Sequence, residues 1–229
     1  MSDGKCMLAV GVDEAGRGPL IGDMFLAAVG VCLDYLKALQ EEGIKDSKKL
    51  SPTGRKRLFP KIVELSEVII VRRYTPEDID TSNINNLFAK GVTDLLRSIR
   101  SLGFHVAELY IDAVNSPKIE ARVLGELEWI GNIRYEVKAD EKFPIVGAAS
   151  IVAKFLRDQH VSTLQDMYGD FGSGYPSDPR TVKWIEEWIA KEGEPPPIVR
   201  RSWKTMRRYG YHKEKKTFRT LTDYLKKKK

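Results

Sequence analysis

The sequence contains few of the residue types that form disulfides or bind transition metals. Cysteine occurs twice, as Cys6 and Cys32, and histidine occurs three times in 229 residues. Two cysteines are too few for a disulfide framework or for a zinc site built from cysteines. Because disulfides persist mainly in oxidising compartments, this usage indicates a reducing, cytoplasmic setting.

Long apolar runs and internal repeats are also absent. No hydrophobic run is long enough to cross a bilayer, and the N-terminus lacks the pattern of a signal peptide. A content of 42% hydrophobic and 31% charged residues is typical of a globular protein, and the chain is long enough to bury a sizeable core. The sequence therefore predicts one large domain or a domain with an appendage, and nothing in it demands more than a monomer.

Positive charge is distributed unevenly along the chain. The net charge is +6, yet residues 200–229 hold 13 Lys or Arg and 2 acids, a net of +11. Residues 1–199 carry a net of −5. A basic end on an acidic body indicates a polyanionic partner. The lysines at 226–229 are equally compatible with a solvated tail.

Hydrophobic periodicity predicts an α/β protein in which strands and helices alternate. The expected strands cover 7–10, 24–33, 67–74, 106–113 and 133–138. The expected helices cover 34–43, 85–102, 116–128, 144–167, 180–191 and 202–209, with another that begins after Ser51 and kinks or ends at Pro60. A turn-rich connector follows residue 168, so we expect a core over 1–167, a helical region over 168–212 and a basic tail over 213–229.

The stretch Gly11-Val12-Asp13-Glu14-Ala15-Gly16-Arg17-Gly18-Pro19 organises the rest of the chain. It places two adjacent carboxylates where an apolar strand meets a Gly/Pro-rich turn. Burying two like charges is costly unless a cation neutralises them, which favours a hard cation such as Mg²⁺ or Mn²⁺. Asp13 and Glu14 could instead be ordinary solvated loop acids. The glycines around Arg17 allow the backbone to approach a phosphate or a sugar closely.

Two further acids follow predicted strands. Asp112 ends one strand and Asp140 comes just after another, so the sheet could bring both near Asp13 and Glu14. Four carboxylates would repel one another without metal, but with two divalent cations they form a site that can hydrolyse a phosphodiester. Spacing alone leaves this convergence as one arrangement among several.

The motifs together resemble the ribonuclease HII family, in its archaeal branch, over about residues 7–209. The first is the stretch from Gly11 to Pro19, and four others follow in the order typical of that family. They are Asp46-Ser47-Lys48-Lys49-Leu50, Tyr110-Ile111-Asp112-Ala113, Lys138-Ala139-Asp140 with the following Phe143-Pro144-Ile145-Val146 and Ala148–Lys154, and Gly172–Arg180. None would suffice singly, but five in order are highly specific.

The resemblance implies a ribonuclease H-like mixed sheet flanked by helices, with a smaller C-terminal helical region that binds substrate. It implies cleavage of RNA in RNA–DNA hybrids and on the 5′ side of single ribonucleotides in duplex DNA, leaving 3′-hydroxyl and 5′-phosphate ends. Such an activity serves primer and ribonucleotide removal in replication and repair. Asp13, Glu14, Asp112 and Asp140 would be the catalytic, metal-binding set for two Mg²⁺ or Mn²⁺ ions.

The resemblance also implies residues that recognise the substrate. The backbone of Gly16-Arg17-Gly18 would contact the 2′-hydroxyl, which distinguishes RNA from DNA. Tyr175 would pack against the sugar beside the RNA–DNA junction, although it could instead be a turn aromatic that covers the core. Lys48 and Arg17 are candidates for phosphate contacts.

The basic C-terminal segment mixes aromatic and cationic residues in a way that suits a nucleic-acid surface, and its aromatics could equally be core. The aromatic residues are Trp203, Tyr209 and Tyr211, and the cationic ones are Arg200, Arg201, Lys204, Arg207 and Arg208.

Two departures from the family pattern stand out. Asp23 occupies a position that is usually proline, where it could alter metal preference or point to solvent. The segment Phe218–Leu225 is similar to the sliding-clamp motif of archaeal members, keeping Leu221 and Tyr224 but lacking the glutamine and the second aromatic. A sliding-clamp partner is therefore a hypothesis that rests on a degenerate motif.

Two other functions compete with this interpretation. The chain could be a non-catalytic protein that binds RNA or hybrids through its basic end, but clustered carboxylates hinder the binding of a polyanion. It could also be another nuclease of the ribonuclease H fold, such as a resolvase. The Gly-Arg-Gly loop together with Tyr175 favours ribonucleotide selection.

Overall fold

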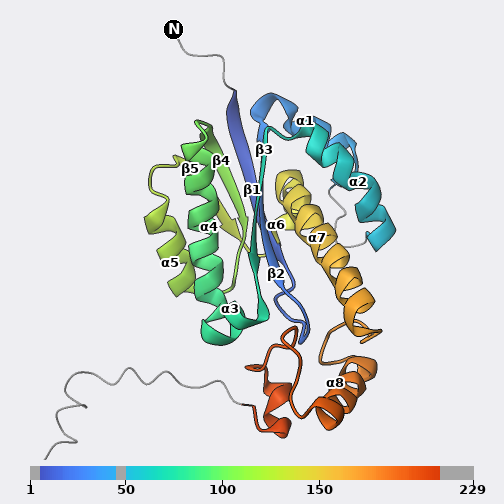
Figure 1. The fold of residues 1–229 in the computed structure, drawn as a ribbon. Coiled ribbons are helices and arrows are strands. Elements are labelled where there is room, and N and C mark those ends of the chain that lie inside the picture. Colours follow the sequence, from blue (N-terminus) through green and yellow to red (C-terminus); the bar gives the residue numbers. More distant parts are fainter. Residues whose placement is uncertain (1–5, 45–49, 212–229) are drawn as a thin grey trace, which may run out of the picture.

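The computed structural model describes residues 6–44 and 50–211. Its centre is a five-stranded sheet in the order β3-β2-β1-β4-β5 (Figure 1). The strands are β1 Met7–Ala15, β2 Met24–Cys32, β3 Val68–Tyr74, β4 His105–Asp112 and β5 Asn132–Glu136. β1, β2 and β3 pair in antiparallel fashion, whereas β4 runs parallel to β1 and β5 parallel to β4. The mixed sheet agrees with the predicted class.

Helices cover both faces of the sheet. The α-helices are α1 Leu36–Glu41, α2 Pro52–Leu65, α3 Pro76–Thr81, α4 Ile84–Ser101, α5 Pro117–Glu126, α6 Ala139–Lys142, α7 Pro144–Tyr168 and α8 Pro179–Glu192. Two 3₁₀ helices, η1 Leu33–Tyr35 and η3 Lys204–Tyr209, complete the described elements. α4 and α5 lie on one face, and α7 with α1 and α2 lies on the other (Figure 1). Among the described residues, no helix combines the length and the apolar character needed to cross a membrane.

Alternation along β1 and β2 produces the two halves of the core. Leu8, Val10 and Val12 point to the face covered by α4, where they form one apolar cluster with Met24 and Leu26 of β2. The odd-numbered residues of the two strands point to the other face and join the cluster under α7, which includes Ala15, Ala27, Val29 and Val31. A third cluster joins Leu20 and Ile21 to the C-terminal segment around α8 and η3.

Helix α7 lies unusually close to β1 because residue 11 is glycine. A Cβ atom at Gly11 would lie 2.2 Å from the carbonyl oxygen of Ile145 at the start of α7. Backbone cannot yield at such a distance, so only glycine permits this contact. The small residues predicted on one side of this helix, including Ala148 and Ala149, are fully buried in the same cluster.

Several predicted boundaries were wrong for identifiable reasons. β1 continues past residue 10 to Ala15 because its ladder with β2 holds as far as the pair Ala15↔Phe25. α2 continues through Pro60, which is exposed, so the carbonyl that loses its helical partner can bind water instead. The expected helix over 202–209 is a 3₁₀ helix, and α3 and α6 are short elements that periodicity did not predict.

The two cysteines form a disulfide, which the sequence analysis did not expect. Cys6 precedes β1 and Cys32 ends β2, with their Cα atoms 5.6 Å apart. A pair 26 residues apart in sequence is brought together only by the antiparallel ladder, in which Leu8 lies opposite Cys32. Two cysteines are thus enough for one bond, although not for a framework of several.

The contact between α7 and β1 generates a stability prediction. Gly11→Ala should lower the free energy of unfolding by about 1–3 kcal/mol, because the added methyl group forces the start of α7 away from β1. Denaturant unfolding measures the change. The matched control is Gly125→Ala on the exposed side of α5, where an added Cβ meets no atom within 4 Å. This control should be neutral or stabilising by up to about 1 kcal/mol. Equal effects in the two variants would contradict the packing argument.

Candidate active site

Two of the predicted acids meet at one edge of the sheet. β1 and β4 are parallel, and their register pairs Val12 with Ile111, so Asp13 and Asp112 are the next residues of neighbouring strands. Residues two apart on a strand point to the same face of the sheet. Gly11 and Tyr110 face α7, so Asp13 and Asp112, two residues further along each strand, face α7 as well. The sheet thereby brings together two carboxylates that lie 99 positions apart in the chain.

Asp140 reaches the same region through α6. This short helix lies between the sheet and α7 (Figure 1), and its first residue, Ala139, donates its backbone N–H to Oδ1 of Asp112 at 2.8 Å. Lys138, just before it, has a positive φ of 59°, which turns the chain sharply from β5 into α6. Asp140 is 2% exposed. The acid after β5 is therefore tied to the acid that ends β4.

Asp13 is a buried acid with a strongly raised pKa. It is 4% exposed, and burial, together with the neighbouring charges of Glu14 and Asp112, raises its pKa well above the ordinary value. The nearby Ser150 side chain and the charge of Lys154, both on α7, lower the pKa of Asp13 but do not cancel the effect. The alternative in which Asp13 is a solvated loop acid is wrong.

Glu14 points to the opposite face of the sheet from Asp13. Its Oε1 accepts a hydrogen bond from Nε of Arg17 at 2.7 Å, and Nη1 of Arg17 donates to Oδ1 of Asn85 on α4 at 2.8 Å. Oε2 of Glu14 and Nη2 of Arg17 are both buried and have no hydrogen-bond partner within the described residues. Buried polar atoms are almost always hydrogen-bonded, so this unused acceptor and this unused donor are available to a bound ligand.

The donor set fits a hard divalent cation. All four predicted ligands are carboxylates, the donors that Mg²⁺ and Mn²⁺ prefer. The pKa of Asp13 is raised by burial first and by the charges of Glu14 and Asp112 second, and a bound cation would offset both effects. In the described part of the chain, no three of these acids bring their oxygens within 4.8 Å of one another, as Cys6, Cys32 and Glu67 do with their ligand atoms.

The Gly16-Arg17-Gly18 loop lies beside the acids and is covered by aromatic residues from the C-terminal region. Gly16 has a positive φ of 91°, which favours glycine. A Cβ on Gly18 would lie 3.4 Å from the ring of Tyr175, and Nε1 of Trp203 donates to the carbonyl of Gly18 at 3.1 Å. The structure therefore brings the predicted loop and the predicted tyrosine into contact. Tyr175 is 37% exposed, so it does not cover the core as a buried turn aromatic would.

Arg200 holds this loop from beneath, a role that sequence reasoning missed. The side chain is fully buried, and it donates to the carbonyls of Gly16 at 2.6 Å, Arg17 at 3.1 Å and Gly22 at 2.9 Å. Burial lowers the pKa of Arg200 to about 10, so it stays charged at neutral pH. The expectation that Arg200 belongs to an exposed basic surface is wrong. The apolar Ile198 and Val199 just before it were the available signal of burial.

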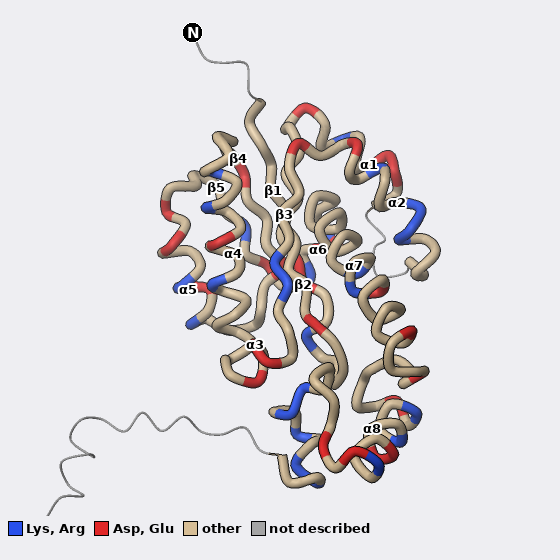
Figure 2. The backbone as a smooth tube through the Cα atoms, viewed as in Figure 1, with Lys and Arg blue, Asp and Glu red and all other residues tan. Residues whose placement is uncertain are grey.

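The rest of the aromatic and basic segment is divided between core and surface. Trp203, Tyr209 and Tyr211 pack against the third apolar cluster, and the hydroxyl of Tyr209 donates to Glu186 on α8 at 2.8 Å. Figure 2 shows basic and acidic residues interleaved around α8 and the segment that follows it. The aromatics therefore serve as packing residues as well as flanking a basic surface.

Asp23 does not point to solvent, which was one of the two alternatives drawn from the sequence. It is 5% exposed and pairs with Arg73 on β3 and with Nε2 of His160 on α7, the latter at 3.3 Å. Burial raises the pKa of Asp23, but the hydrogen bonds from His160 and Arg73 outweigh that effect and the net pKa is lowered. This acid is neutralised within the fold, and His160 is its partner.

Two predicted sites lie outside the described residues. Lys48 falls in the segment 45–49, and the degenerate clamp motif Phe218–Leu225 falls in 212–229.

The family model, the sequence relatives and the solved structures that resemble this chain all point to one family. The model of the family Ribonuclease HII matches residues 10–206. Ribonuclease HII of Pyrococcus abyssi is 42% identical over 224 residues, covering 96% of this chain and 98% of the relative. Ribonuclease H2 of Pyrococcus horikoshii OT3 has a TM-score of 0.81 at 39% identity, covering 88% of this chain and 96% of that one. Ribonuclease HII of Archaeoglobus fulgidus, solved in a complex with PCNA, has a TM-score of 0.75 at 37% identity, over 86% and 94% of the two chains. The chain therefore has the ribonuclease H-like fold, belongs to the ribonuclease HII family and is a ribonuclease H.

Proposed function

We propose that this ribonuclease H cleaves the RNA strand of RNA–DNA hybrids and cuts 5′ of single ribonucleotides in duplex DNA, leaving 3′-hydroxyl and 5′-phosphate ends. The observation that carries the proposal is the parallel register of β1 and β4, which sets Asp13 beside Asp112 at the sheet edge next to the Gly16–Gly18 loop. A cluster of acids beside a backbone that can approach a ribose closely combines hydrolysis with selection of RNA. The cellular role would be removal of primers and ribonucleotides in replication and repair, in the cytoplasm.

Asp13, Glu14, Asp112 and Asp140 would hold the divalent cations on which this family depends. Two such cations, Mg²⁺ or Mn²⁺, supply an activated water and stabilise the leaving oxygen of the phosphodiester. Arg17 orients Glu14 through the contact at 2.7 Å and leaves Nη2 to donate to a phosphate oxygen. On the α7 face, Ser150 and Lys154 lie near Asp13 and favour its ionised, metal-binding form.

Substrate selection would rest on the Gly16–Gly18 loop and on Tyr175. The backbone of Gly16-Arg17-Gly18 is held by the guanidinium of Arg200 and carries no side chain of its own at its two glycines, so at the exposed Gly18 it can approach a 2′-hydroxyl closely. The half-exposed ring of Tyr175 lies against Gly18, where it can pack on the sugar that follows the junction. Lys48 is proposed as a further phosphate contact.

The division of the chain follows from these roles. Residues 1–167 would form the catalytic core, 168–212 a helical region that binds substrate, and 213–229 a basic tail, with the enzyme acting as a monomer. The complex of the Archaeoglobus fulgidus relative with PCNA supports a sliding-clamp contact through Phe218–Leu225. That part of the proposal rests on a motif that retains only Leu221 and Tyr224.

The direct test is cleavage of duplex DNA that contains one ribonucleotide, with Mg²⁺ and with EDTA, beside an all-DNA duplex. Metal-dependent cutting 5′ of the ribonucleotide supports the whole proposal. Cutting of the all-DNA duplex as well would keep the metal site and discard selection by the 2′-hydroxyl. Binding without cutting would instead favour the non-catalytic hybrid-binding protein.

Asp13→Asn should abolish cleavage and stabilise the metal-free protein. Loss of one metal ligand should lower activity by more than the roughly 100-fold typical of outer-shell changes.

The raised pKa of Asp13 means that its ionised form is disfavoured in the folded state. This lowers the free energy of unfolding above pH 3.8, the ordinary pKa of the group, and has no effect below it. In EDTA at neutral pH the variant should therefore melt above the wild type, by roughly 2–4 °C per kcal/mol recovered. Mg²⁺ should raise the Tm of the wild type alone.

Asp166→Asn on the exposed side of α7 is the matched control, with unchanged cleavage and Tm. Full activity of Asp13→Asn would remove Asp13 from the catalytic set.

Tyr175→Ala should lower kcat/KM on a single-ribonucleotide duplex by about 5- to 30-fold, the equivalent of 1–2 kcal/mol of lost packing. Tyr175→Phe keeps the ring and should remain near wild type. Long hybrids should be affected less, because they lack a junction at each cut. Tyr35→Ala, an exposed tyrosine on η1, controls for loss of an aromatic side chain. Equal losses on both substrates would contradict a junction role.

Arg200→Lys should lower cleavage by about 10- to 100-fold, because a lysine cannot donate to three carbonyls in the planar fork that holds the loop. The loss should appear in kcat as well as KM, since the loop orients the ribose during the reaction. Arg201→Lys is the matched control, because its side chain contacts Glu194 and Pro195 rather than the loop. A lower Tm with unchanged kcat and KM would limit Arg200 to a role in folding.

A further inference from the structure

Three neighbouring strands bring a sulfur or carboxylate ligand to the end of the sheet opposite the acids. Cys6 immediately precedes β1, Cys32 ends β2 and Glu67 immediately precedes β3. The ladders set these positions, since Leu8 lies opposite Cys32 and Gly30 opposite Val68, while the backbone N–H of Glu67 donates to Gly30 at 2.9 Å. The three residues are therefore held by the most regular part of the fold.

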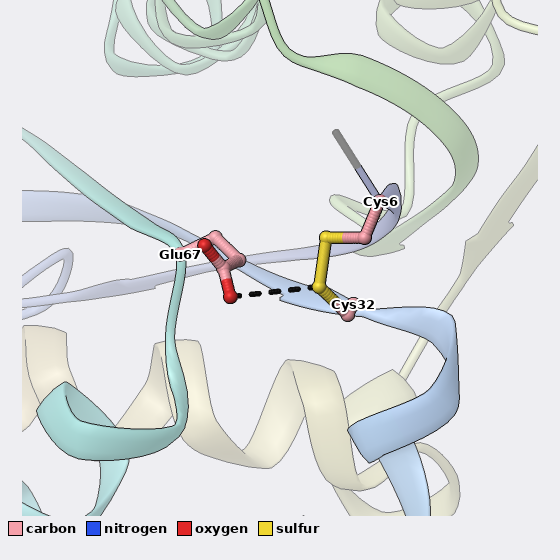
Figure 3. A group of neighbouring side chains, drawn as sticks. All are labelled: Cys6, Cys32 and Glu67. Carbon is pink, nitrogen blue, oxygen red and sulfur yellow. Dashed lines mark hydrogen bonds between the residues drawn. A yellow bond between two sulfur atoms is a disulfide. The ribbon is translucent and has the colours of Figure 1, made fainter. Parts of the chain in front are cut away.

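The side chains of these residues converge on one point. One ligand atom from each of Cys6, Cys32 and Glu67 lies within 4.8 Å of the other two. Cys6 and Cys32 are joined in a disulfide, and Sγ of Cys32 lies 3.5 Å from Oε1 of Glu67 (Figure 3). Cys32 is 5% exposed and Cys6 half-buried, whereas Glu67 is exposed and gives an entry route from solvent.

In the disulfide form, the sulfur of Cys32 cannot form a hydrogen bond to the carboxylate of Glu67 that faces it. A disulfide sulfur carries no hydrogen, so it cannot donate to the carboxylate that faces it. After reduction the same sulfur can donate to Glu67 as a thiol, or it can lose its proton and bind a metal as a thiolate. Two thiolates and one carboxylate form a donor set that suits Zn²⁺ and that Mg²⁺ avoids.

We infer that Cys6, Cys32 and Glu67 form a redox-dependent site for a thiophilic divalent cation such as Zn²⁺. In the oxidised chain the sulfurs are tied to each other and cannot bind the cation. A dithiol or phosphine reductant gives two electrons to the disulfide, and the sulfurs take up two protons as the S–S bond breaks. Binding then releases the two thiol protons and places two thiolates and one carboxylate on the cation, with a solvent molecule as fourth ligand. A low-molecular-weight disulfide reverses the change by thiol–disulfide exchange.

This site is separate from the acidic cluster. Asp13 lies seven residues beyond Cys6 along the same extended strand, which corresponds to about 20 Å at 3.3 Å per residue. The ligand chemistry also differs, because the acidic cluster offers oxygen alone. A sulfur-based spectroscopic signal therefore reports on this site without interference from cations bound by the acids.

The test uses Co²⁺ as the probe with the full-length protein. Protein reduced with a phosphine and transferred to anaerobic buffer is titrated with Co²⁺ while the thiolate-to-cobalt charge-transfer absorption is recorded. We expect one equivalent to produce this band in the reduced protein and none in the oxidised protein. Zn²⁺ should displace the band and Mg²⁺ should not.

Variants separate the three ligands from other residues. Cys32→Ser and Cys6→Ser should each weaken or abolish the band, and testing both guards against misfolding of either one. Glu67→Gln should weaken Co²⁺ binding by at least the roughly 10-fold that loss of an outer-shell partner costs. Glu64→Gln, an exposed neighbour on α2, should bind as the wild type does. Asp13→Asn should leave the band unchanged, because it removes only an oxygen ligand of the other site.

Three results would overturn the inference. One is the absence of a charge-transfer band in protein whose two thiols have been titrated as reduced. Another is a disulfide that the phosphine cannot reduce while the protein stays folded. The third is an unchanged affinity for Co²⁺ in Glu67→Gln, which would show that the two cysteines bind the cation without Glu67.

Discussion

The contact between strand β1 and the start of helix α7 is the constraint on which the rest of the structure depends. It exists because residue 11 has no side chain, so the carbonyl of Ile145 can lie where any other residue would place a Cβ. The contact sets Ser150 and Lys154 opposite Asp13, and it holds α6 between the sheet and α7. The electrostatics of the acidic cluster are thus a consequence of how closely one helix can lie on one strand.

Asp13 and Glu14 are adjacent in sequence but point to opposite faces of the sheet. Asp13 interacts with α7, whereas Glu14 interacts with Arg17 and through it with α4. The two helical layers therefore each contact one of the two acids. A ligand that binds both acids must meet the sheet at its edge, where the C-terminal ends of β1 and β4 lie together. The Gly16–Gly18 loop, which continues directly from β1, lies at this same edge.

The sequence predicted the local features well and the long-range ones poorly. The apolar strands, the helix cap at Ser51 and the acid that ends β4 depend on neighbouring residues, and each is present in the structure. The pairing of Cys6 with Cys32, the neutralisation of Asp23 by Arg73 and the burial of Arg200 depend on contacts between distant segments. Periodicity carries no information about such contacts, and the cysteine count excluded only a framework of several disulfides.

The catalytic assignment came from the resemblance more than from spacing. Spacing placed Asp13, Asp112 and Asp140 at the ends of predicted strands, but it could not tell which strands are neighbours or which run in parallel. The observed order, with β4 next to β1, supplies that information for Asp13 and Asp112. Asp140 needed in addition the left-handed turn at Lys138, which a lysine adopts rarely and which no sequence rule would have placed there.

The hydrogen bonds from Arg200 to Gly16 and Arg17 have a consequence for the order of assembly. A ribosome releases the chain from its N-terminus, so strand β1 and the loop after it are made among the first residues. The guanidinium that holds the loop is made more than 180 residues later, since the two partners are 184 positions apart. An incomplete chain that ends before residue 200 therefore carries all four acids but lacks the guanidinium that holds this loop. Synthesis must pass Trp203 before the loop can form the hydrogen bonds described here.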